Sequence, residues 1–235
     1  MIPARPHRKR VKHYHEPGDL HELTFSCYSR LPLLTNNQWR RWLARCIDEA
    51  NREEGIRLAG FVFMPEHVHL LVWPCLPSTP GPSSGATGSA SASGATGSAS
   101  ALSGNATVCS SADPTTPNIG RYLALIKQPL SKQIKQTLIE NNSKLLDRLI
   151  VTERPGKRCF RFWQEGPGYD RNLNQPDTIQ NSLDYIHNNP VTRGLCRRAI
   201  DWKWSTARWY LLDPPKQQDP DLPFIHGLPP GTFDR

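Results

Sequence analysis

A long stretch without charge divides this chain into two parts. Residues 70–112 contain no charged side chain, and most of the stretch repeats Ser, Gly and Ala, with the unit SGATGSAS recurring. Such a composition cannot bury enough apolar area to offset its ordering entropy. We therefore predict a flexible insert at 77–117 without chemistry of its own. One folded domain must then be built from the segments on either side, 18–76 and 118–212.

The segment before the insert has the pattern of a strand, a helix and two further strands. LHELTFSCY at 20–28 mixes β-branched and aromatic residues, and apolar residues then recur at helical spacing over 39–47. Gly55 is expected to end that helix. The apolar runs IRLAGFVFM and HVHLLVW follow and are joined at 64–66, which predicts a β-hairpin.

The segment after the insert adds helices and little strand. Apolar residues recur at helical spacing from Ile119 to Leu138, with Pro129 as an expected kink or break. FRFWQEG is a short strand or extended piece, and a second helix is expected from Pro176 to Pro190. Helices thus alternate with too few strands for a doubly wound sheet, so we predict an α+β fold with a mainly antiparallel sheet flanked by helices. A Pro-rich tail follows at 213–235.

The positive charge of the chain is concentrated near its start. The formal net charge is +8, and the arm at 1–17 contains Arg8, Lys9 and Arg10 among further basic residues. Such a cluster favours binding to a polyanion; the alternatives are a solubilising tail or a targeting signal. No stretch reaches the roughly 18 to 20 apolar residues of a membrane span, and the start lacks the apolar run of a secretory signal. We expect a cytoplasmic protein without membrane contact.

The six cysteines are scattered and form no CxxC pair. Several lie inside apolar segments. They fit buried thiols in a reducing compartment better than a disulfide framework or a zinc site.

Two histidines in HVHLLV are the first candidates for chemistry. His67 and His69 are two residues apart, so in a strand both imidazoles project from one face while Val68 and Leu70 point to the other. Two neutral imidazoles on one face are able to bind one metal ion. The spacing alone is equally compatible with two histidines on the surface or in the core.

Tyr185 and Asn189 in SLDYIHNNPV are the second candidates. They are four residues apart and therefore lie on neighbouring turns of one helical face. The apolar stripe of that helix consists of Ile179, Leu183 and Ile186, and Tyr185 falls well over 90° from it. A tyrosine in this position either serves a site or packs against a neighbouring strand.

These motifs together resemble a known family. MPEHVHLLV, then a Lys-rich amphipathic helix, FWQEGPGYDR, LDYIHNNPVTRGL and DWKWSTAR resemble, in this order, the IS200-like Y1 transposases, in particular the REP-associated tyrosine transposases. The resemblance covers 18–75 and 118–212. It implies a ferredoxin-like HUH endonuclease domain with metal ligands His67, His69 and Asn189 and with Tyr185 as the nucleophile. Tyr169 is a second, lower-ranked candidate because it precedes the helix.

The resemblance also implies a reaction and its partners. A bacterial, nucleoid-associated enzyme would cleave and rejoin single-stranded DNA at hairpin elements through a 5′-phosphotyrosine, with Mg²⁺ or Mn²⁺. The alternatives are a replication initiator or relaxase, or a catalytically silent hairpin-binding protein. The sequence leaves the oligomeric state open between monomer and homodimer, which decides whether Tyr185 works on its own chain's histidines or on a partner's. The expected DNA contacts are Arg8, Lys9, Arg10, Lys127, Arg161 and Arg171.

Overall fold

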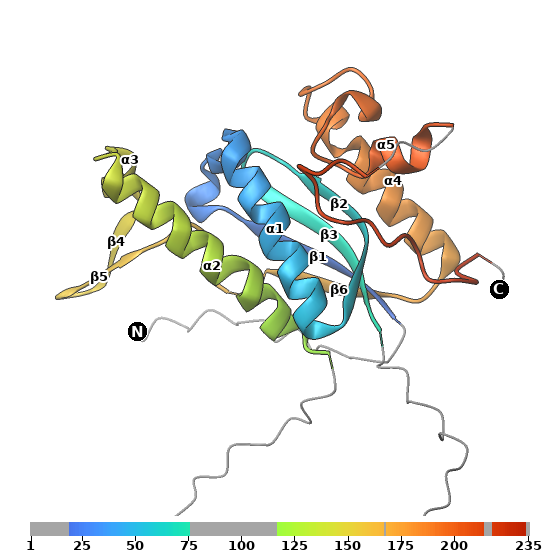
Figure 1. The fold of residues 1–235 in the computed structure, drawn as a ribbon, viewed down its shortest axis with the longest axis horizontal. Coiled ribbons are helices and arrows are strands. Elements are labelled where there is room, and N and C mark those ends of the chain that lie inside the picture. The colour runs from blue at the N-terminus through green and yellow to red at the C-terminus, as the bar shows by residue number, and fades with distance from the viewer. Residues whose placement is uncertain (1–18, 76–116, 167, 214–217, 234–235) are drawn as a thin grey trace, which may run out of the picture.

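The computed structural model describes residues 19–75, 117–166, 168–213 and 218–233 (Figure 1). The predicted basic arm at 1–17 and the predicted insert up to residue 116 lie outside this part. So do Arg8, Lys9 and Arg10.

One four-stranded antiparallel sheet forms the centre of the fold. Its strands lie in the order β2-β3-β1-β6. They are β1 (Leu20–Ser26), β2 (Ile56–Phe63), β3 (His67–Pro74) and β6 (Tyr169–Leu173). Helix α1 (Asn37–Glu54) connects β1 to β2, and α2 (Ile119–Glu140) precedes β6. This strand order with two crossing helices is the ferredoxin-like arrangement, so the predicted α+β class and the β2–β3 hairpin are confirmed.

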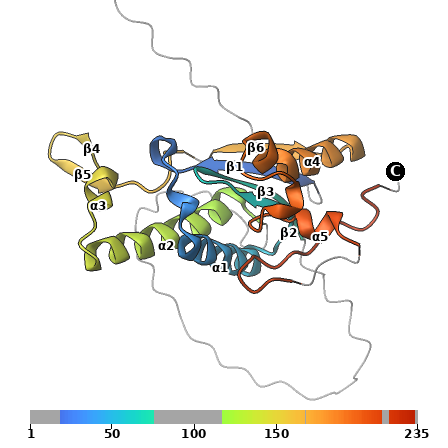
Figure 2. The ribbon, with the colours of Figure 1, turned by 90° about the horizontal axis from the view of Figure 1, so that it is seen from above.

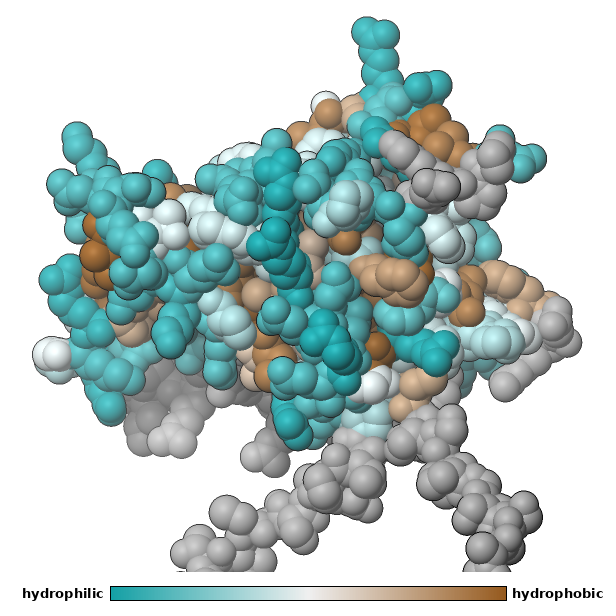
Figure 3. Space-filling model, in the orientation of Figure 1, coloured by the Kyte–Doolittle hydropathy of each residue, from teal (hydrophilic) through white to brown (hydrophobic). Residues whose placement is uncertain are grey.

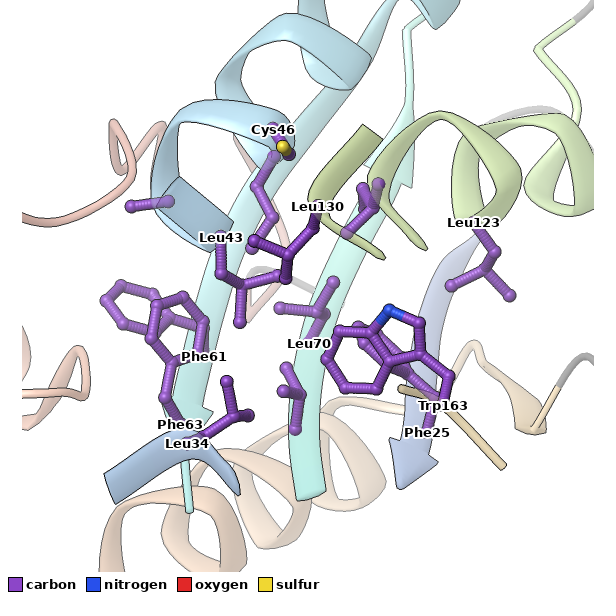
Figure 4. Packing of buried hydrophobic residues seen from close by; sticks show 14 of the residues in the cluster. Phe25, Leu34, Leu43, Cys46, Phe61, Phe63, Leu70, Leu123, Leu130 and Trp163 are labelled. Atoms are coloured by element: carbon purple, nitrogen blue, oxygen red, sulfur yellow. The ribbon is translucent and has the colours of Figure 1, made fainter. Parts of the chain in front are cut away.

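Helices cover both faces of this sheet (Figure 2). Helices α1 and α2 lie on one face, and α4 (Pro176–Thr192) lies on the other. The alternation of side chains along β3 explains these layers, because successive residues of a strand point to opposite faces. Val68 and Leu70 belong to the core under α1 and α2, where Leu70 lies among Leu43 and Leu130 (Figure 4). Leu71 instead packs with Leu183 of α4.

The start and end of α1 follow from its sequence. The Asn36 side chain accepts hydrogen bonds from the backbone N–H groups of Gln38 and Trp39 and so caps the first turn. Gly55 ends the helix with φ of 62°, a left-handed conformation that costs glycine little. This end agrees with the sequence-based expectation.

Pro129 does not break its helix, and Pro190 does not end its own. Pro129 lies within α2, which continues unbroken to Glu140, and Pro190 lies within α4, which continues to Thr192. Proline costs a helix one N–H bond, and near the end of α4 this loss is small. The backbone N–H of Arg193 still bonds to the Asn189 carbonyl, and the chain leaves the helix at Gly194, whose φ is 68°.

A second, two-stranded sheet lies apart from the first. It follows α3 (Leu145–Leu149) and consists of β4 (Ile150–Arg154) and β5 (Lys157–Phe160). The chain then returns to the main sheet in an extended segment, where Trp163 forms an isolated bridge with Cys27. The sequence pattern allowed a short strand here, and the segment is extended with that single bridge. Short helices complete the fold at Tyr28–Arg30, Leu33–Thr35, Ala199–Asp201 and Ala207–Leu211.

The C-terminal residues pack on the same domain. The buried guanidinium of Arg40 on α1 lies 5.1 Å from the ring of Trp202 and 5.3 Å from that of Trp204. Such cation–π contacts hold residues 202–204 against α1. The backbone N–H of His226 bonds to the carbonyl of Leu58 on β2.

The cysteines of the described residues are all free thiols. Cys27 and Cys46 are buried, while Cys75, Cys159 and Cys196 are half-buried. Burial raises the pKa of Cys27 to about 12 and that of Cys46 to about 11. Within the described ranges, no helix is both long and apolar enough to cross a bilayer.

Candidate functional site

The candidate site lies on the α4 face of the main sheet. His67 and His69 point to this face because Val68 and Leu70 take the alternate positions on β3. His69 is paired across the ladder with Thr24 of β1, and Thr24 is paired in turn with Tyr169 of β6. The three side chains therefore form one row across the sheet.

The two imidazoles converge on one point. Nε2 of His67 lies 3.0 Å from Nε2 of His69, and the rings are nearly perpendicular, at 86°. Two nitrogens bound to one metal ion at about 2.1 Å and about 90° to each other lie about 3 Å apart. The observed separation thus fits two ligands of one ion.

Each imidazole has an oxygen-bearing side chain beside its other nitrogen. Nδ1 of His69 lies 2.8 Å from the hydroxyl oxygen of Thr24, at hydrogen-bond distance. Nδ1 of His67 lies 3.2 Å from Oε1 of Glu66, and this carboxylate favours a proton on Nδ1. Nε2 of His67 then has a free lone pair, and Nε2 of His69 has one in the tautomer that donates to Thr24.

Burial keeps both histidines neutral near pH 7. His67 and His69 are 5% and 4% exposed. Burial lowers the pKa of His69 to about 3, with a further lowering from the neighbouring His67. Burial also lowers the pKa of His67, and the nearby Glu66 carboxylate opposes this shift. Neutral imidazole is the form that binds metal ions.

Helix α4 brings the two other candidates to the same point. The amide nitrogen of Asn189 lies 3.2 Å from Nε2 of His69, and a half turn of the amide puts its oxygen there instead. The ring of Tyr185 lies 5.3 Å from that of His69, centroid to centroid, in an edge arrangement. Asn189 is buried, whereas Tyr185 is 54% exposed. Tyr185 is therefore not a core residue of α4. The structure therefore brings His67, His69, Asn189 and Tyr185 together.

Two cavities adjoin this group. The smaller, of about 320 Å³, contains both histidines, Tyr185 and Asn189. Its wall also contains two basic side chains, Arg30 and Arg193. The larger, of about 530 Å³, extends from His69 and Tyr185 towards β6, and it is lined further by Glu22, Thr24, Tyr169, Arg171, Thr178, Asn181 and Ser182.

Tyr169 occupies a different position from Tyr185. It is half exposed and lines only the larger of these two cavities. Its strand is two strands away from that of His69, which corresponds to about 10 Å. Tyr169 is therefore less well placed than Tyr185 to act at the histidine pair.

Three predicted DNA contacts lie in different surroundings. Arg171 lines the larger cavity and forms an ion pair of 2.8 Å with Glu22. Arg161 pairs with Glu153 on β4, away from both cavities. Nζ of Lys127 donates to the carbonyl of Gly166 and lies 5.0 Å from the Phe25 ring centre, so it also lies apart from the histidines.

Sequence reasoning missed four residues of this site. Thr24 contacts His69 only because of the β1–β3 register, which no local pattern reveals. Glu66 directly precedes His67, and Arg193 closely follows Asn189, so their places in the sequence were a usable signal. Glu66 and Arg193 form an ion pair at the cavity. Arg30 ends the short helix Tyr28–Arg30 and has a positive φ of 51°.

The donors present fit a divalent cation. Among the described residues, no group of three or more His, Cys, Asp or Glu side chains gathers as a metal site. The candidate set instead consists of two imidazoles and the amide of Asn189, which leaves room in the cavity for further oxygen ligands. Imidazole and amide ligands suit several divalent ions, so the donors alone do not select one.

The fold and the cavity define an α+β protein of ferredoxin-like topology with a two-histidine site beneath a tyrosine-bearing helix. The chain is similar in fold to a solved structure of a REP-associated tyrosine transposase bound to a REP hairpin, with a TM-score of 0.53. The sequences are 16% identical, and the match covers 94% of this chain and 97% of that one. No protein-family model and no curated protein matches the sequence. At 16% identity, this similarity establishes only that the two folds are alike.

Proposed function

We propose that this protein cleaves and rejoins single-stranded DNA next to hairpin elements, with Tyr185 as the nucleophile. The observation that carries the proposal is the convergence of the two Nε2 atoms, the Asn189 amide and the Tyr185 ring on one cavity. Strand β3 and helix α4 supply these groups, although His69 and Asn189 are 120 residues apart in the sequence. A purely structural role does not require an exposed tyrosine beside two buried imidazoles.

His67, His69 and Asn189 would hold a divalent cation, with Mg²⁺ or Mn²⁺ expected in cells. Such an ion supplies a Lewis acid that polarises the scissile phosphate and offsets the charge that builds on its oxygens. Thr24 and Glu66 orient the two imidazoles from behind. Outer contacts of this kind commonly keep ligands in place.

Tyr185 performs the covalent step. Its hydroxyl oxygen attacks the phosphorus of a phosphodiester and loses its proton to solvent. The bond from phosphorus to the 3′ oxygen breaks, and that oxygen takes up a proton, which leaves a 5′-phosphotyrosine and a 3′ hydroxyl. A 3′ hydroxyl of another strand later reverses the step, so joining needs no external energy source.

The basic residues at the cavity suit a phosphate backbone. Arg30 and Arg193 line the smaller cavity, and Arg171 lines the larger. Guanidinium groups bind phosphate oxygens well because their donors match the geometry of the anion. A single strand passing from one cavity to the other would carry its phosphate past Tyr185.

The hairpin in the proposal follows from the resemblance of the sequence motifs, and the likeness in fold supports it. The similar solved structure is that of a transposase bound to a REP hairpin. A hairpin also provides what the cavity needs, a duplex that fixes the position of its single-stranded flank.

The test is a covalent-adduct assay. The protein is incubated with end-labelled hairpin oligonucleotides carrying single-stranded flanks, with Mg²⁺ or Mn²⁺, and resolved on a denaturing gel. We expect a DNA–protein adduct that depends on the metal and on Tyr185. An adduct that persists in Tyr185→Phe would overturn the nucleophile assignment, and wild-type cleavage by His67→Ala would overturn the metal site.

A further inference from the structure

The two-stranded sheet of β4 and β5 is strongly basic. We call residues 150–160 the ribbon. Over 144–161, which includes its base, there are six basic and two acidic residues, an excess of four positive charges. The basic residues are Lys144, Arg148, Arg154, Lys157, Arg158 and Arg161. The excess is half the formal net charge of the chain, which is +8.

Two arginines of the ribbon have no acidic partner among the described residues. Glu153 pairs with Lys157 and Arg161, and its bond to Lys157 is the main cause that lowers the pKa of Glu153 to about 2. Arg154 and Arg158 are exposed and form no ion pair within the part of the chain that the structure describes. Their charge is therefore available to an outside anion.

The ribbon projects from the body of the protein. Figures 1 and 2 both show β4 and β5 beyond the end of the main sheet, and Figure 3 shows hydrophilic side chains over much of this end. Five residues of strand extend about 17 Å. The turn at its tip contains Gly156 with φ of 78° and no side chain. A B-DNA major groove, about 12 Å wide and about 8.5 Å deep, admits a two-stranded ribbon.

The base of the ribbon is fixed to the domain. Leu149 is fully buried, Phe160 packs on the core, and the Arg161 N–H bonds to the Leu149 carbonyl at 2.7 Å. No residue of 150–160 is buried, and 152–158 are all exposed, so the outer part of the ribbon contributes little to the core.

The base also leads directly to the candidate site. The N–H of Tyr28 bonds to the Phe162 carbonyl, and the N–H of Gln164 bonds to the Ser26 carbonyl, each at 2.8 Å. Ser26 lines the smaller cavity and is paired with His67. The ribbon therefore emerges at the end of the sheet that carries the histidines.

We propose that the ribbon binds the duplex stem of a DNA hairpin in its major groove, with Arg154 and Arg158 against the phosphates. The stem would then lie beside the smaller cavity, and its single-stranded flank would enter that cavity. This inference rests on the proposed function for the role of the single-stranded flank as the substrate that is cleaved. The binding of the stem by the ribbon does not depend on cleavage and can be measured separately. It assigns duplex affinity to the ribbon and strand cleavage to the α4 face.

The experiment compares two double variants of the full chain. Arg154→Ala with Arg158→Ala removes the two unpaired charges of the ribbon. Arg45→Ala with Arg52→Ala removes two exposed charges from α1 and is the matched control. The probes are a fluorescent hairpin with a stem of about 12 base pairs, a little over one helical turn, and its flank alone as a single strand. Anisotropy titrations at several salt concentrations give the affinities.

We expect the ribbon variant to bind the hairpin about 10- to 100-fold more weakly than the wild type. The slope of log affinity against log salt should fall in magnitude by about 2, because two phosphate contacts are lost. Binding of the single strand should change by less than about twofold, as should hairpin binding by the control. Equal hairpin affinity and salt slope in the ribbon variant and the wild type would overturn the assignment.

The adduct assay on the same variants separates the two proposals. If the wild type forms no adduct but the ribbon variant binds the hairpin more weakly than the wild type does, the catalytic proposal fails and the ribbon assignment stands. If adducts form and the ribbon variant binds the hairpin normally, the ribbon assignment alone fails.

Discussion

Nε2 of His67 lies 3.0 Å from Nε2 of His69, while a carboxylate and a hydroxyl face the opposite nitrogens of the two rings. This relationship gives the two buried histidines of the α4 face the geometry expected of the proposed pair of metal ligands. Two lone pairs directed at one point favour a cation between them, because the cation relieves the repulsion and satisfies both nitrogens.

We predict that Mn²⁺ stabilises the wild type and fails to stabilise His69→Ala. A ligand that binds only the folded state at 100 times its Kd adds about 2.7 kcal/mol to the free energy of unfolding. The measurement is the melting temperature with and without Mn²⁺. His226→Ala, which changes an exposed histidine outside both cavities, is the control. Equal stabilisation of His69→Ala and the wild type would contradict the metal site.

Replacement of Tyr185 by Phe should abolish the covalent adduct and leave the fold intact. The side chain is 54% exposed, so the loss of its hydroxyl should change the free energy of unfolding by less than about 0.5 kcal/mol. Binding of a DNA hairpin should be retained. The paired control is Tyr169→Phe, which should still form the adduct; loss of adduct in this variant alone would exchange the roles of the two tyrosines.

Thr24→Val should weaken metal binding although Thr24 is not a proposed ligand. Its hydroxyl lies 2.8 Å from Nδ1 of His69, and Val leaves that nitrogen without its partner. Loss of such an outer contact typically lowers metal affinity about 10- to 100-fold. Isothermal titration with Mn²⁺ measures the change. Thr24→Ser keeps the hydroxyl and should bind Mn²⁺ nearly as the wild type does; equal weakening by Ser and Val would point to packing instead.

Gly60→Ala should crowd the contact between β2 and Leu183 of α4, the helix that carries Tyr185 and Asn189. A Cβ atom at Gly60 would lie 3.0 Å from Cδ2 of Leu183, closer than ordinary packing allows. Overpacking of this kind costs about 1–3 kcal/mol. Chemical denaturation measures that cost, and the adduct assay measures the effect on the site. Adding Leu183→Ala to Gly60→Ala makes room for the new methyl group and should recover part of the activity. No recovery would mean that the contact with Leu183 is not the cause of the effect of Gly60→Ala.

Local patterns in the sequence predicted the elements that matter most for the site. The alternation in HVHLLV predicted which face of β3 the histidines occupy, since Val68 and Leu70 enter the opposite core. The apolar stripe of α4 likewise predicted that Tyr185 is not a core residue of that helix. Both features depend on short-range periodicity, which the sequence contains in full.

Contacts between segments that are distant in the sequence could not be predicted from local patterns. That Thr24 faces His69 depends on a register between strands 45 residues apart. The ribbon was missed because short exposed strands bury little apolar surface and so leave a weak hydrophobic pattern. Pro129 was expected to kink or break its helix and Pro190 to end its own, because the packing of these helices was unknown. Both helices continue past the proline, since that packing outweighs the loss of one backbone bond.

Lys127 should reduce the stability of the protein at neutral pH. Burial lowers the pKa of its ammonium group from 10.5 to about 8. Below pH 8 both the folded and the unfolded chain hold the proton, and the cost of burying the charge is fully present. Between pH 8 and 10.5 the unfolded chain binds more protons, so the free energy of unfolding rises with pH and the cost disappears.

Lys127→Met should therefore be more stable than the wild type at pH 7, and this advantage should shrink as the pH rises from 8 towards 10.5. Its size should be about 1–2 kcal/mol, because solvent screening and the bond to the Gly166 carbonyl offset part of the cost. Urea denaturation at several pH values measures the difference. Lys132→Met, at an exposed position of the same helix, should show no such trend. A difference for Lys127→Met that stays constant with pH would mean that its contacts with Gly166 and Phe25 compensate fully for its burial.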